Sequence, residues 1–229
     1  MNLCATPACG RAAEVPPGCR LGVLGGTFDP IHIGHLIVAE EARVCMTLDT
    51  VLFVPARISP LKQEDGTLFS AEERWQMVEL AIADNPHFSA SRVDLDRQGP
   101  SYTVDTLRQL KTIHRPASIH FILGADSLRS LREWRQPHEI AQLARLVAIS
   151  RPGHDLGLEE LDRDIPGLAE ATDVLETLEI GISSSDIRRR LRQGLPIAYQ
   201  VPRDVERFIY RCASVKGLTL ADRCGPRCA

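Results

Sequence analysis

The stretch from Gly25 to His35, GGTFDPIHIGH, constrains the fold more than any other part of the chain. It follows a short apolar run at residues 21–24, which is typical of a β-strand, and it precedes LIVAEEA at residues 36–42, which is typical of a helix. Glycines let the backbone approach a ligand closely, and a helix N-terminus presents unpaired N–H groups and the positive end of a dipole. The stretch therefore predicts a strand–turn–helix unit that binds an anion, and a phosphate first of all.

Apolar runs and amphipathic segments alternate along the rest of the chain. Apolar or β-branched runs predict strands at residues 50–54, 88–95, 118–123, 146–149 and 174–180. Helical periodicity predicts helices at residues 34–46, 70–83, 103–114, 125–131, 139–144, 185–193 and within 201–213. Ser70, with Glu73 three residues later, forms a capping box at the start of the second helix. Because strands that alternate with helices form βαβ units, we predict an α/β fold, a Rossmann-like doubly wound parallel sheet with helices on both faces.

Composition separates a central domain from two ends. Residues 1–19 are rich in Pro, Gly, Ala and Cys without periodicity, which predicts a flexible extension. Residues 20–213 are expected to form one α/β domain, and residues 214–229 a loosely ordered tail. Inside the domain, residues 154–171 carry many charges and glycines, and we expect an irregular connection there.

The seven cysteines lie mostly outside the predicted elements. Five of them are in the two ends: Cys4, Cys9, Cys19, Cys224 and Cys228. A disulfide framework usually has an even number of cysteines and spans the fold, so reduced thiols are expected. A zinc site built from Cys4, Cys9, Cys224 and Cys228 is the alternative, but these residues lack the tight paired spacing of zinc modules.

The totals give no sign of a nucleic-acid or membrane partner. The formal net charge is −3, so any basic patch must be local. No apolar run approaches the length of about 18 residues that a transmembrane helix needs, and the first residues lack the apolar core of a secretory signal. A cytoplasmic location is therefore expected. The sequence leaves the oligomeric state open, and a homo-oligomer is possible.

Four stretches with chemical potential directly follow predicted strands. They are residues 25–35, 55–62, 124–127 and 181–188. In an open parallel sheet, ligands bind outside the carboxyl ends of the strands. We therefore expect all four stretches to meet at one edge of the sheet.

His32 and His35 flank a glycine within the predicted phosphate turn. Two imidazoles there can donate hydrogen bonds to phosphate oxygens and stabilise the charge that develops during phosphoryl transfer. The rival interpretation is a zinc pair, but a catalytic zinc normally takes three protein ligands, and no glutamate follows His32 as in His-Glu-x-x-His. The pattern favours phosphate contact, and no metal ligand is expected.

The segment from Ser183 to Arg188 offers hydroxyls and N–H groups at a predicted helix start. Arg188 could bind phosphate oxygens in a bidentate manner, although simple N-capping would also explain the serines. Lys62, in the loop after the second strand, could reach a phosphate or be an ordinary surface lysine. The chain has neither Gly-x-x-x-x-Gly-Lys-Ser/Thr nor Gly-x-Gly-x-x-Gly, so it has neither the P-loop nor the dinucleotide-binding fingerprint.

These residues resemble a known family. GTFDPIHIGH at residues 26–35 is similar to the nucleotidyltransferase signature that contains His-x-Gly-His, and ISSSDIR at residues 182–188 is similar to the Ile-Ser-Ser-x-x-Ile-Arg signature of the same superfamily. GPSYTVDTL at residues 99–107, ILGADSL at residues 122–128 and RPG at residues 151–153 resemble bacterial nicotinate-nucleotide adenylyltransferases. The resemblance covers about residues 21–212.

The resemblance implies an enzyme of NAD biosynthesis. ATP and nicotinate mononucleotide would give deamido-NAD and pyrophosphate, with the mononucleotide phosphate attacking the α-phosphorus of ATP in line. Mg²⁺ would accompany ATP as its counter-ion, held mostly by phosphates and water. The fold would be of the nucleotidyltransferase type.

The resemblance also implies roles for individual residues. His32, His35, Arg188 and Lys62 would form the catalytic group around the phosphates. The ATP site would consist of Gly25, Gly26, Thr27, Phe28, His32, His35, Gly124, Asp126, Ile182, Ser184, Ser185 and Arg188. The pyridine mononucleotide would be bound by Tyr102, Thr103 and Trp134, whose indole can stack on the ring. The alternative is that Trp134 is an ordinary buried aromatic residue.

Two other functions remain open from the sequence. One keeps the enzyme class but changes the acceptor to phosphopantetheine, the amide mononucleotide or another nucleotidyl acceptor. The other is a nucleotide-binding regulatory protein without catalysis, against which the intact His32, His35 and Arg188 argue.

Overall fold

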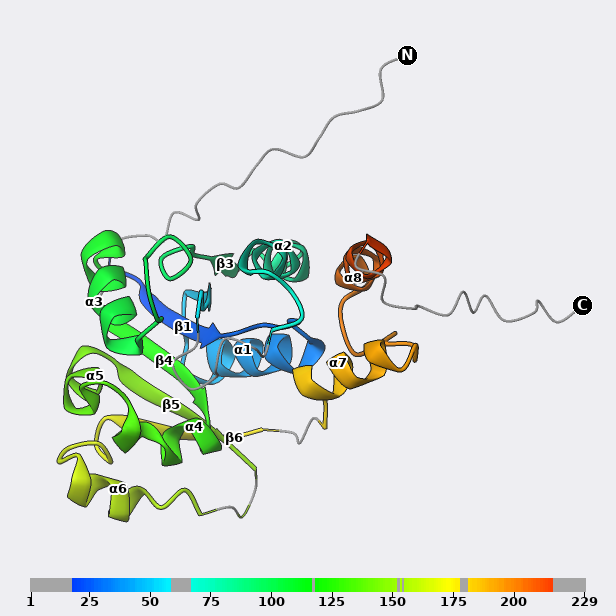
Figure 1. The fold of residues 1–229 in the computed structure, drawn as a ribbon. Helices are drawn as coiled ribbons and strands as arrows, with labels where there is room; N and C mark the ends of the chain where they lie inside the picture. Colours follow the sequence, from blue (N-terminus) through cyan, green and yellow to red (C-terminus); the bar gives the residue numbers. More distant parts are fainter. Residues whose placement is uncertain are drawn as a thin grey trace, which may run out of the picture.

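The computed structural model describes residues 18–58, 67–116, 118–151, 153, 155–177 and 181–215. Its centre is a six-stranded sheet in the order β3-β2-β1-β4-β5-β6, and all five strand pairs are parallel (Figure 1). The strands are β1 Arg20–Gly26, β2 Thr50–Pro55, β3 Phe88–Ala90, β4 Ser118–Gly124, β5 Arg145–Ser150 and β6 Thr172–Glu176. The predicted α/β fold with a parallel sheet is confirmed. The strand order reverses between β1 and β4, which is where open α/β sheets form their ligand crevice.

Helices cover both faces of the sheet (Figure 1). They are α1 Ile33–Cys45, α2 Ala71–Ile82, α3 Thr103–His114, α4 Ala125–Arg129, α5 Pro137–Leu143, α6 Leu158–Asp164, α7 Ser184–Arg192 and α8 Arg203–Val215, with a 3₁₀ turn at Leu131–Glu133. Buried side chains of α3, α4, α5 and α6 belong to one apolar core, and those of α1, α2, α7 and α8 belong to a second. None of the helices within the described ranges is long and apolar enough to cross a membrane.

The two cores lie on opposite faces of the sheet because strand side chains alternate. In β1, Leu21 and Val23 enter the core beneath α3, whereas Leu24 enters the core beneath α1. All three side chains are buried. The sheet is therefore apolar on both faces, as expected for a parallel sheet, and its polar ligand groups concentrate at the strand ends.

The sequence located several element boundaries closely. The capping box of α2 is present, since the Glu73 backbone N–H donates to Ser70 Oγ at 3.3 Å and the Ser70 N–H donates to the Glu73 carboxylate at 2.7 Å. Helix α3 occupies the predicted range. Ser183 is the N-cap of α7, because its hydroxyl accepts from the Asp186 N–H at 3.1 Å.

Two predictions about secondary structure were wrong. The strand expected at residues 88–95 ends at Ala90, because the chain then turns to bury Asp94 against Thr106 of α3. The connection expected to be irregular contains α6, whose Leu161 is buried in the core together with Ile165. The apolar spacing of four residues within that charged segment was the available helical signal.

Smaller differences occur elsewhere. The short helix expected at residues 125–131 ends at Arg129 and is followed by the 3₁₀ turn. Strand β6 begins at Thr172, two residues before the predicted start, and the predicted end of this strand lies outside the described residues. Residues 1–17 and 216–229 are also outside the described part, and with them the alternative zinc site. Of the cysteines within the described ranges, Cys19, Cys45 and Cys212, none is in a disulfide.

Candidate active site

Three of the four predicted stretches meet at the carboxyl edge of the sheet. Gly25, His32, His35, Asp126 and Ile182 all line one cavity of about 590 Å³. The cavity opens between α1 and the ends of β4 and β5, and Gly124 also lines it. The fourth stretch is described only up to residue 58, so Lys62 lies outside the described residues.

A second cavity of about 290 Å³ adjoins the first. Tyr102, Thr103 and Trp134, the predicted pyridine-site residues, all line it. Gly25, Gly26 and Thr27 of the glycine turn line it from the other side. The lining residues common to both cavities are Gly25, Phe121, Ser127 and Trp134. Two binding spaces therefore share a wall at the end of β1 and β4.

The glycine turn is shaped by one aromatic residue. Phe28 is 2% exposed and has a φ of +50°. Its ring folds back against the glycine turn, next to Gly26. A Cβ on Gly26 would lie 3.1 Å from that ring, which is tighter than an ordinary contact. Glycine at this position therefore lets the buried ring sit under the backbone that faces the cavities.

The rings of His32 and His35 pack closely, tilted by 32° to each other, at the start of α1. Their ring centres are 3.7 Å apart, and the Phe28 ring meets His35 edge-on at 5.1 Å. The His32 backbone N–H donates to Nδ1 of His35 at 3.2 Å. Since Nδ1 accepts this bond, the proton of a neutral His35 ring is on Nε2, which makes Nε2 a hydrogen-bond donor.

His32 is the more deeply buried of the two. Burial lowers its pKa to about 4, so the ring is neutral at physiological pH. Within the described part of the chain, its Nδ1 has no hydrogen-bond partner. A neutral imidazole with an unsatisfied buried nitrogen is costly unless a ligand completes its bonding.

Asp29 fixes the turn rather than facing the cavity. Its carboxylate accepts hydrogen bonds from the backbone N–H groups of Leu68 and Phe69, each at 2.9 Å. Its carbonyl accepts from Arg188 Nη1 at 2.8 Å. These contacts give Asp29 the role of holding the turn.

Helix α7 docks onto the same turn. Ser184 Oγ donates to the Pro30 carbonyl at 2.9 Å, and Arg188 Nη2 donates to Ser185 Oγ at 3.1 Å. The distant C-terminal segment is thus brought against the glycine turn, as the sequence predicted. Of the predicted ATP-site residues in this segment, Ile182 lines the larger cavity, Ser184 and Arg188 contact the turn, and Ser185 contacts Arg188.

Asp126 lines the larger cavity, and Trp134 lines both cavities. The Asp126 carboxylate is almost fully exposed and pairs with Arg129 at 2.7 Å. Trp134 packs edge-on against Phe121 at 6.2 Å between ring centres, and its indole N–H donates to Ser130 Oγ at 3.3 Å. An indole held in this way presents a fixed apolar surface to both cavities.

Arg74 of α2 is a site residue that the sequence reasoning missed. It is 2% exposed, and its Nη1 donates to the carbonyls of Thr27 and Ala56, at 2.7 Å in each case. Its Nη2 donates to the Arg57 carbonyl at 3.1 Å. Burial lowers the pKa of the guanidinium, and the charge of Asp29 opposes that shift. The available signal was an arginine on the core-facing side of a helix that otherwise buries apolar residues.

Asp94 is a second missed residue, and it lines the smaller cavity. Thr106 Oγ1 donates to its Oδ1 at 2.6 Å, and Arg97 Nη2 lies 2.7 Å from the same oxygen. Burial raises the pKa of this carboxyl, while Thr106 and Arg97 act in the opposite direction. No motif pointed to Asp94, because Thr106, its closest partner, is brought to it only by the fold.

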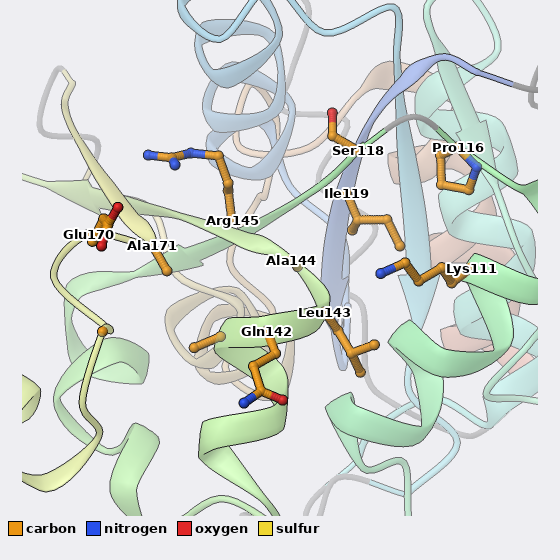
Figure 2. A pocket seen from close by; sticks show the side chains of 12 residues that line it. Lys111, Pro116, Ser118, Ile119, Gln142, Leu143, Ala144, Arg145, Glu170 and Ala171 are labelled. Carbon is orange, nitrogen blue, oxygen red and sulfur yellow. The ribbon is translucent and has the colours of Figure 1, made fainter.

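A third cavity lies away from all these residues. It has a volume of about 370 Å³ and lies between the ends of α3 and α5 and the starts of β4 and β5. Figure 2 shows its lining, which includes Lys111, Arg145 and Glu170. None of the predicted site residues lines it. Among the described residues, no group of three or more His, Cys, Asp or Glu side chains is arranged to hold a metal ion.

Comparisons with known proteins agree with this geometry. A family model described as cytidylyltransferase-like matches residues 23–190. A probable nicotinate-nucleotide adenylyltransferase of Roseiflexus is 47% identical over 189 residues, which are 82% of this chain and 94% of the relative. A probable nicotinate-nucleotide adenylyltransferase of Leifsonia xyli is 44% identical over 190 residues, which are 83% and 90% of the two chains.

Solved structures show the same fold. Plasmodium falciparum nicotinic acid mononucleotide adenylyltransferase complexed with NaAD is similar with a TM-score of 0.68 at 19% identity. The match covers 88% of this chain and 99% of that one. At this identity the likeness concerns the fold alone.

Proposed function

This chain belongs to the cytidylyltransferase-like family and, within it, to the nicotinate-nucleotide adenylyltransferases; from that premise we propose how its two cavities perform the reaction. The enzyme transfers the adenylyl group of ATP to nicotinate mononucleotide, which yields deamido-NAD and pyrophosphate. It is a nucleotidyltransferase of NAD biosynthesis.

One observation carries this proposal: the two cavities share a wall at the glycine turn. The larger cavity, beside His32 and His35, accepts ATP, and the smaller one, with Tyr102 and Trp134, accepts the pyridine mononucleotide. Gly25 belongs to both linings, so the reacting phosphates meet above it. The turn brings the two reactants together without contributing a nucleophile, and positioning of this kind can supply a large part of the rate enhancement.

The reaction is a single in-line displacement. An oxygen of the mononucleotide 5′-phosphate attacks the α-phosphorus of ATP. The bond between that phosphorus and the oxygen bridging to the β-phosphate breaks as the new P–O bond forms, and pyrophosphate leaves with the bridging oxygen. The protein's task is to hold the two phosphates in line and to stabilise the negative charge of the transition state.

The start of α1 supplies that stabilisation. Nε2 of His35 is a donor because Nδ1 is already engaged, and the helix N-terminus adds its N–H groups and dipole. His32 remains neutral and serves as a hydrogen-bonding group rather than as a fixed charge. Arg188 is held by Asp29 and Ser185 next to this turn, from where it would bind the outer phosphates with Ser184 and Ser185.

The smaller cavity suits a pyridine ring. Trp134 and Tyr102 provide aromatic walls, and Thr103 is the first residue of α3, where backbone N–H groups lack partners within the helix. A carboxylate on the ring would accept hydrogen bonds from those N–H groups and from the Thr103 hydroxyl.

Gly124 and Asp126, in the larger cavity, would bind a ribose of the nucleotide.

We propose Mg²⁺ as the counter-ion of ATP. The described residues offer few carboxylates at the phosphate turn, and Asp29 is committed to backbone N–H groups. This donor set fits an ion held by phosphate oxygens and water, which is the usual state of Mg²⁺ with nucleotides. The ion would neutralise part of the phosphate charge.

The test is an assay of the full chain with ATP and Mg²⁺. Pyrophosphate release should require a mononucleotide, and nicotinate mononucleotide should give an equal amount of the deamido dinucleotide by mass spectrometry. A reaction without mononucleotide serves as the control for ATP hydrolysis. If neither nicotinate mononucleotide nor nicotinamide mononucleotide gives pyrophosphate release, even at high enzyme concentration, the assigned reaction is wrong.

A further inference from the structure

The smaller cavity has one positive charge available to a ligand. Its charged lining residues are Asp94, Glu133 and Arg135. Asp94 is buried, and Arg97 offsets its charge at 2.7 Å. Glu133, like Arg135, is exposed to solvent. Within the described residues, Arg135 is therefore the cation on this lining.

An aromatic wall holds Arg135 in place. Its guanidinium carbon lies 4.9 Å from the centre of the Tyr102 ring, within the range of a cation–π contact. The side chain is about half exposed, with 52% of its surface accessible. Stacking on Tyr102 orders this otherwise mobile side chain beside the start of α3, where Thr103 also lines the cavity.

Asp105 neutralises Arg135 only in part. Its Oδ2 lies 3.5 Å from Arg135 Nη1, whereas its Oδ1 accepts a hydrogen bond from Arg108 Nη1 at 3.0 Å. Arg108 also pairs with Glu139 of α5. Because Asp105 is shared and its closer contact is with Arg108, part of the Arg135 charge remains to act on the cavity.

We propose that Arg135 selects the carboxylate form of the pyridine mononucleotide over the amide form. Nicotinate and nicotinamide have nearly the same shape but differ by one negative charge, so a placed cation is a means of separating them. The inference rests on the proposed function, since it concerns the substrate of the same site. Arg135 is a specificity residue in this reading and takes no part in the phosphoryl chemistry.

The test compares both mononucleotides on the wild-type chain and on Arg135→Gln. The glutamine variant keeps length and polarity but loses the charge. The kcat/KM for nicotinate mononucleotide should fall about fivefold, as expected for a partly screened ion pair of about 1 kcal/mol, while the value for nicotinamide mononucleotide stays unchanged. Raising the salt concentration should reduce the acid preference of the wild type and leave that of Arg135→Gln almost constant.

Two further variants sharpen the result. Arg135→Lys keeps the charge and should retain most of the acid preference. Arg132→Gln removes a neighbouring arginine that pairs with Glu160 and Asp164 and lines neither nucleotide cavity, so it should leave the preference intact. An equal loss for both mononucleotides in Arg135→Gln would overturn the proposal, because Arg135 would then contact a part that both share.

Separate measurements of binding and turnover distinguish the role of Arg135 from the assigned reaction. Calorimetric titration of each mononucleotide gives the acid-to-amide affinity ratio without catalysis, and Arg135→Gln should lower this ratio. If Arg135→Gln lowers the affinity ratio but the wild type releases no pyrophosphate, the reaction assignment fails while the role of Arg135 stands. If the wild type turns over and the ratio is the same in both proteins, the role of Arg135 fails alone.

Discussion

At the scale of single residues, a backbone contact within the histidine pair determines which ring nitrogen of His35 carries the proton. The His32 N–H fixes the acceptor nitrogen of His35, and the His32 ring packs closely against the His35 ring. The proton of a neutral His35 ring is therefore on Nε2. Here a backbone contact takes the orienting role that an acidic side chain has in many catalytic pairs.

Replacing His35 should therefore separate activity from folding. His35→Ala should lower kcat at least about 100-fold, as loss of a preorganised donor to a transition-state oxygen does, with a circular dichroism spectrum like that of the wild type. His138→Ala, on the exposed side of α5 and outside both nucleotide cavities, is the matched control and should keep full activity. A near-normal kcat in His35→Ala would remove this residue from the mechanism.

At the scale of elements, Arg74 links α2 to two strand ends. Its guanidinium binds the carbonyls that follow β1 and β2, so one helix holds the glycine turn and the exit of the neighbouring strand at a fixed separation. Asp29 adds a second link between the turn and the residues just before α2. The phosphate turn is therefore held by tertiary contacts as well as by its own sequence.

Loss of Arg74 should affect both stability and nucleotide binding. Arg74→Met keeps the apolar stem but leaves three carbonyls without this donor, so the free energy of unfolding should fall by about 2–4 kcal/mol and the KM for ATP should rise. Gln76→Met, at an exposed position of the same helix, should change stability by less than about 0.5 kcal/mol. Urea unfolding and steady-state kinetics measure the two effects. Unchanged stability in Arg74→Met would mean that water satisfies those carbonyls.

The elements also show where sequence reasoning succeeds. Local signals located the turn after β1, the capping box of α2 and all of α3, because glycine, capping and periodicity act within a few residues. Arg74 and Asp94 were missed because the carbonyls that Arg74 binds are 17 or more residues away in the sequence, and Thr106, which binds Asp94, is 12 residues away, so only the fold brings them together. Helix α6 was not predicted because its segment is rich in charged residues and contains only a short apolar spacing, from Leu161 to Ile165.

At the scale of the whole molecule, two buried histidines make stability depend on pH. Burial lowers the pKa of His32 to about 4 and also lowers that of His120, where the charge of Arg20 adds to the effect. Both side chains are neutral in the folded protein near neutral pH, whereas in the unfolded chain they bind protons near the ordinary histidine value of about 6.5. The unfolded state therefore binds more protons once the pH drops below about 6.5.

Stability should accordingly fall as the pH drops from about 6.5 towards 4. His32 alone would account for a loss of about 3 kcal/mol over this window, since each pKa unit corresponds to about 1.4 kcal/mol. Urea unfolding at pH 8, 6.5, 5.5 and 4.5 measures the trend, and His32→Gln should reduce the slope below about pH 6.5. A slope in His32→Gln equal to that of the wild type would show that this histidine is protonated alike in both states.

The common wall of the two cavities has a consequence for inhibitor design. A molecule that carries an adenosine-like head and a pyridine-like head on one short linker could occupy both spaces at once, on either side of Gly25 and Trp134. Once the first head is bound, the second is held at a high local concentration, so the combined affinity can exceed that of either head by orders of magnitude. Linker length would be the decisive variable, because a linker too short to pass the wall loses the whole advantage.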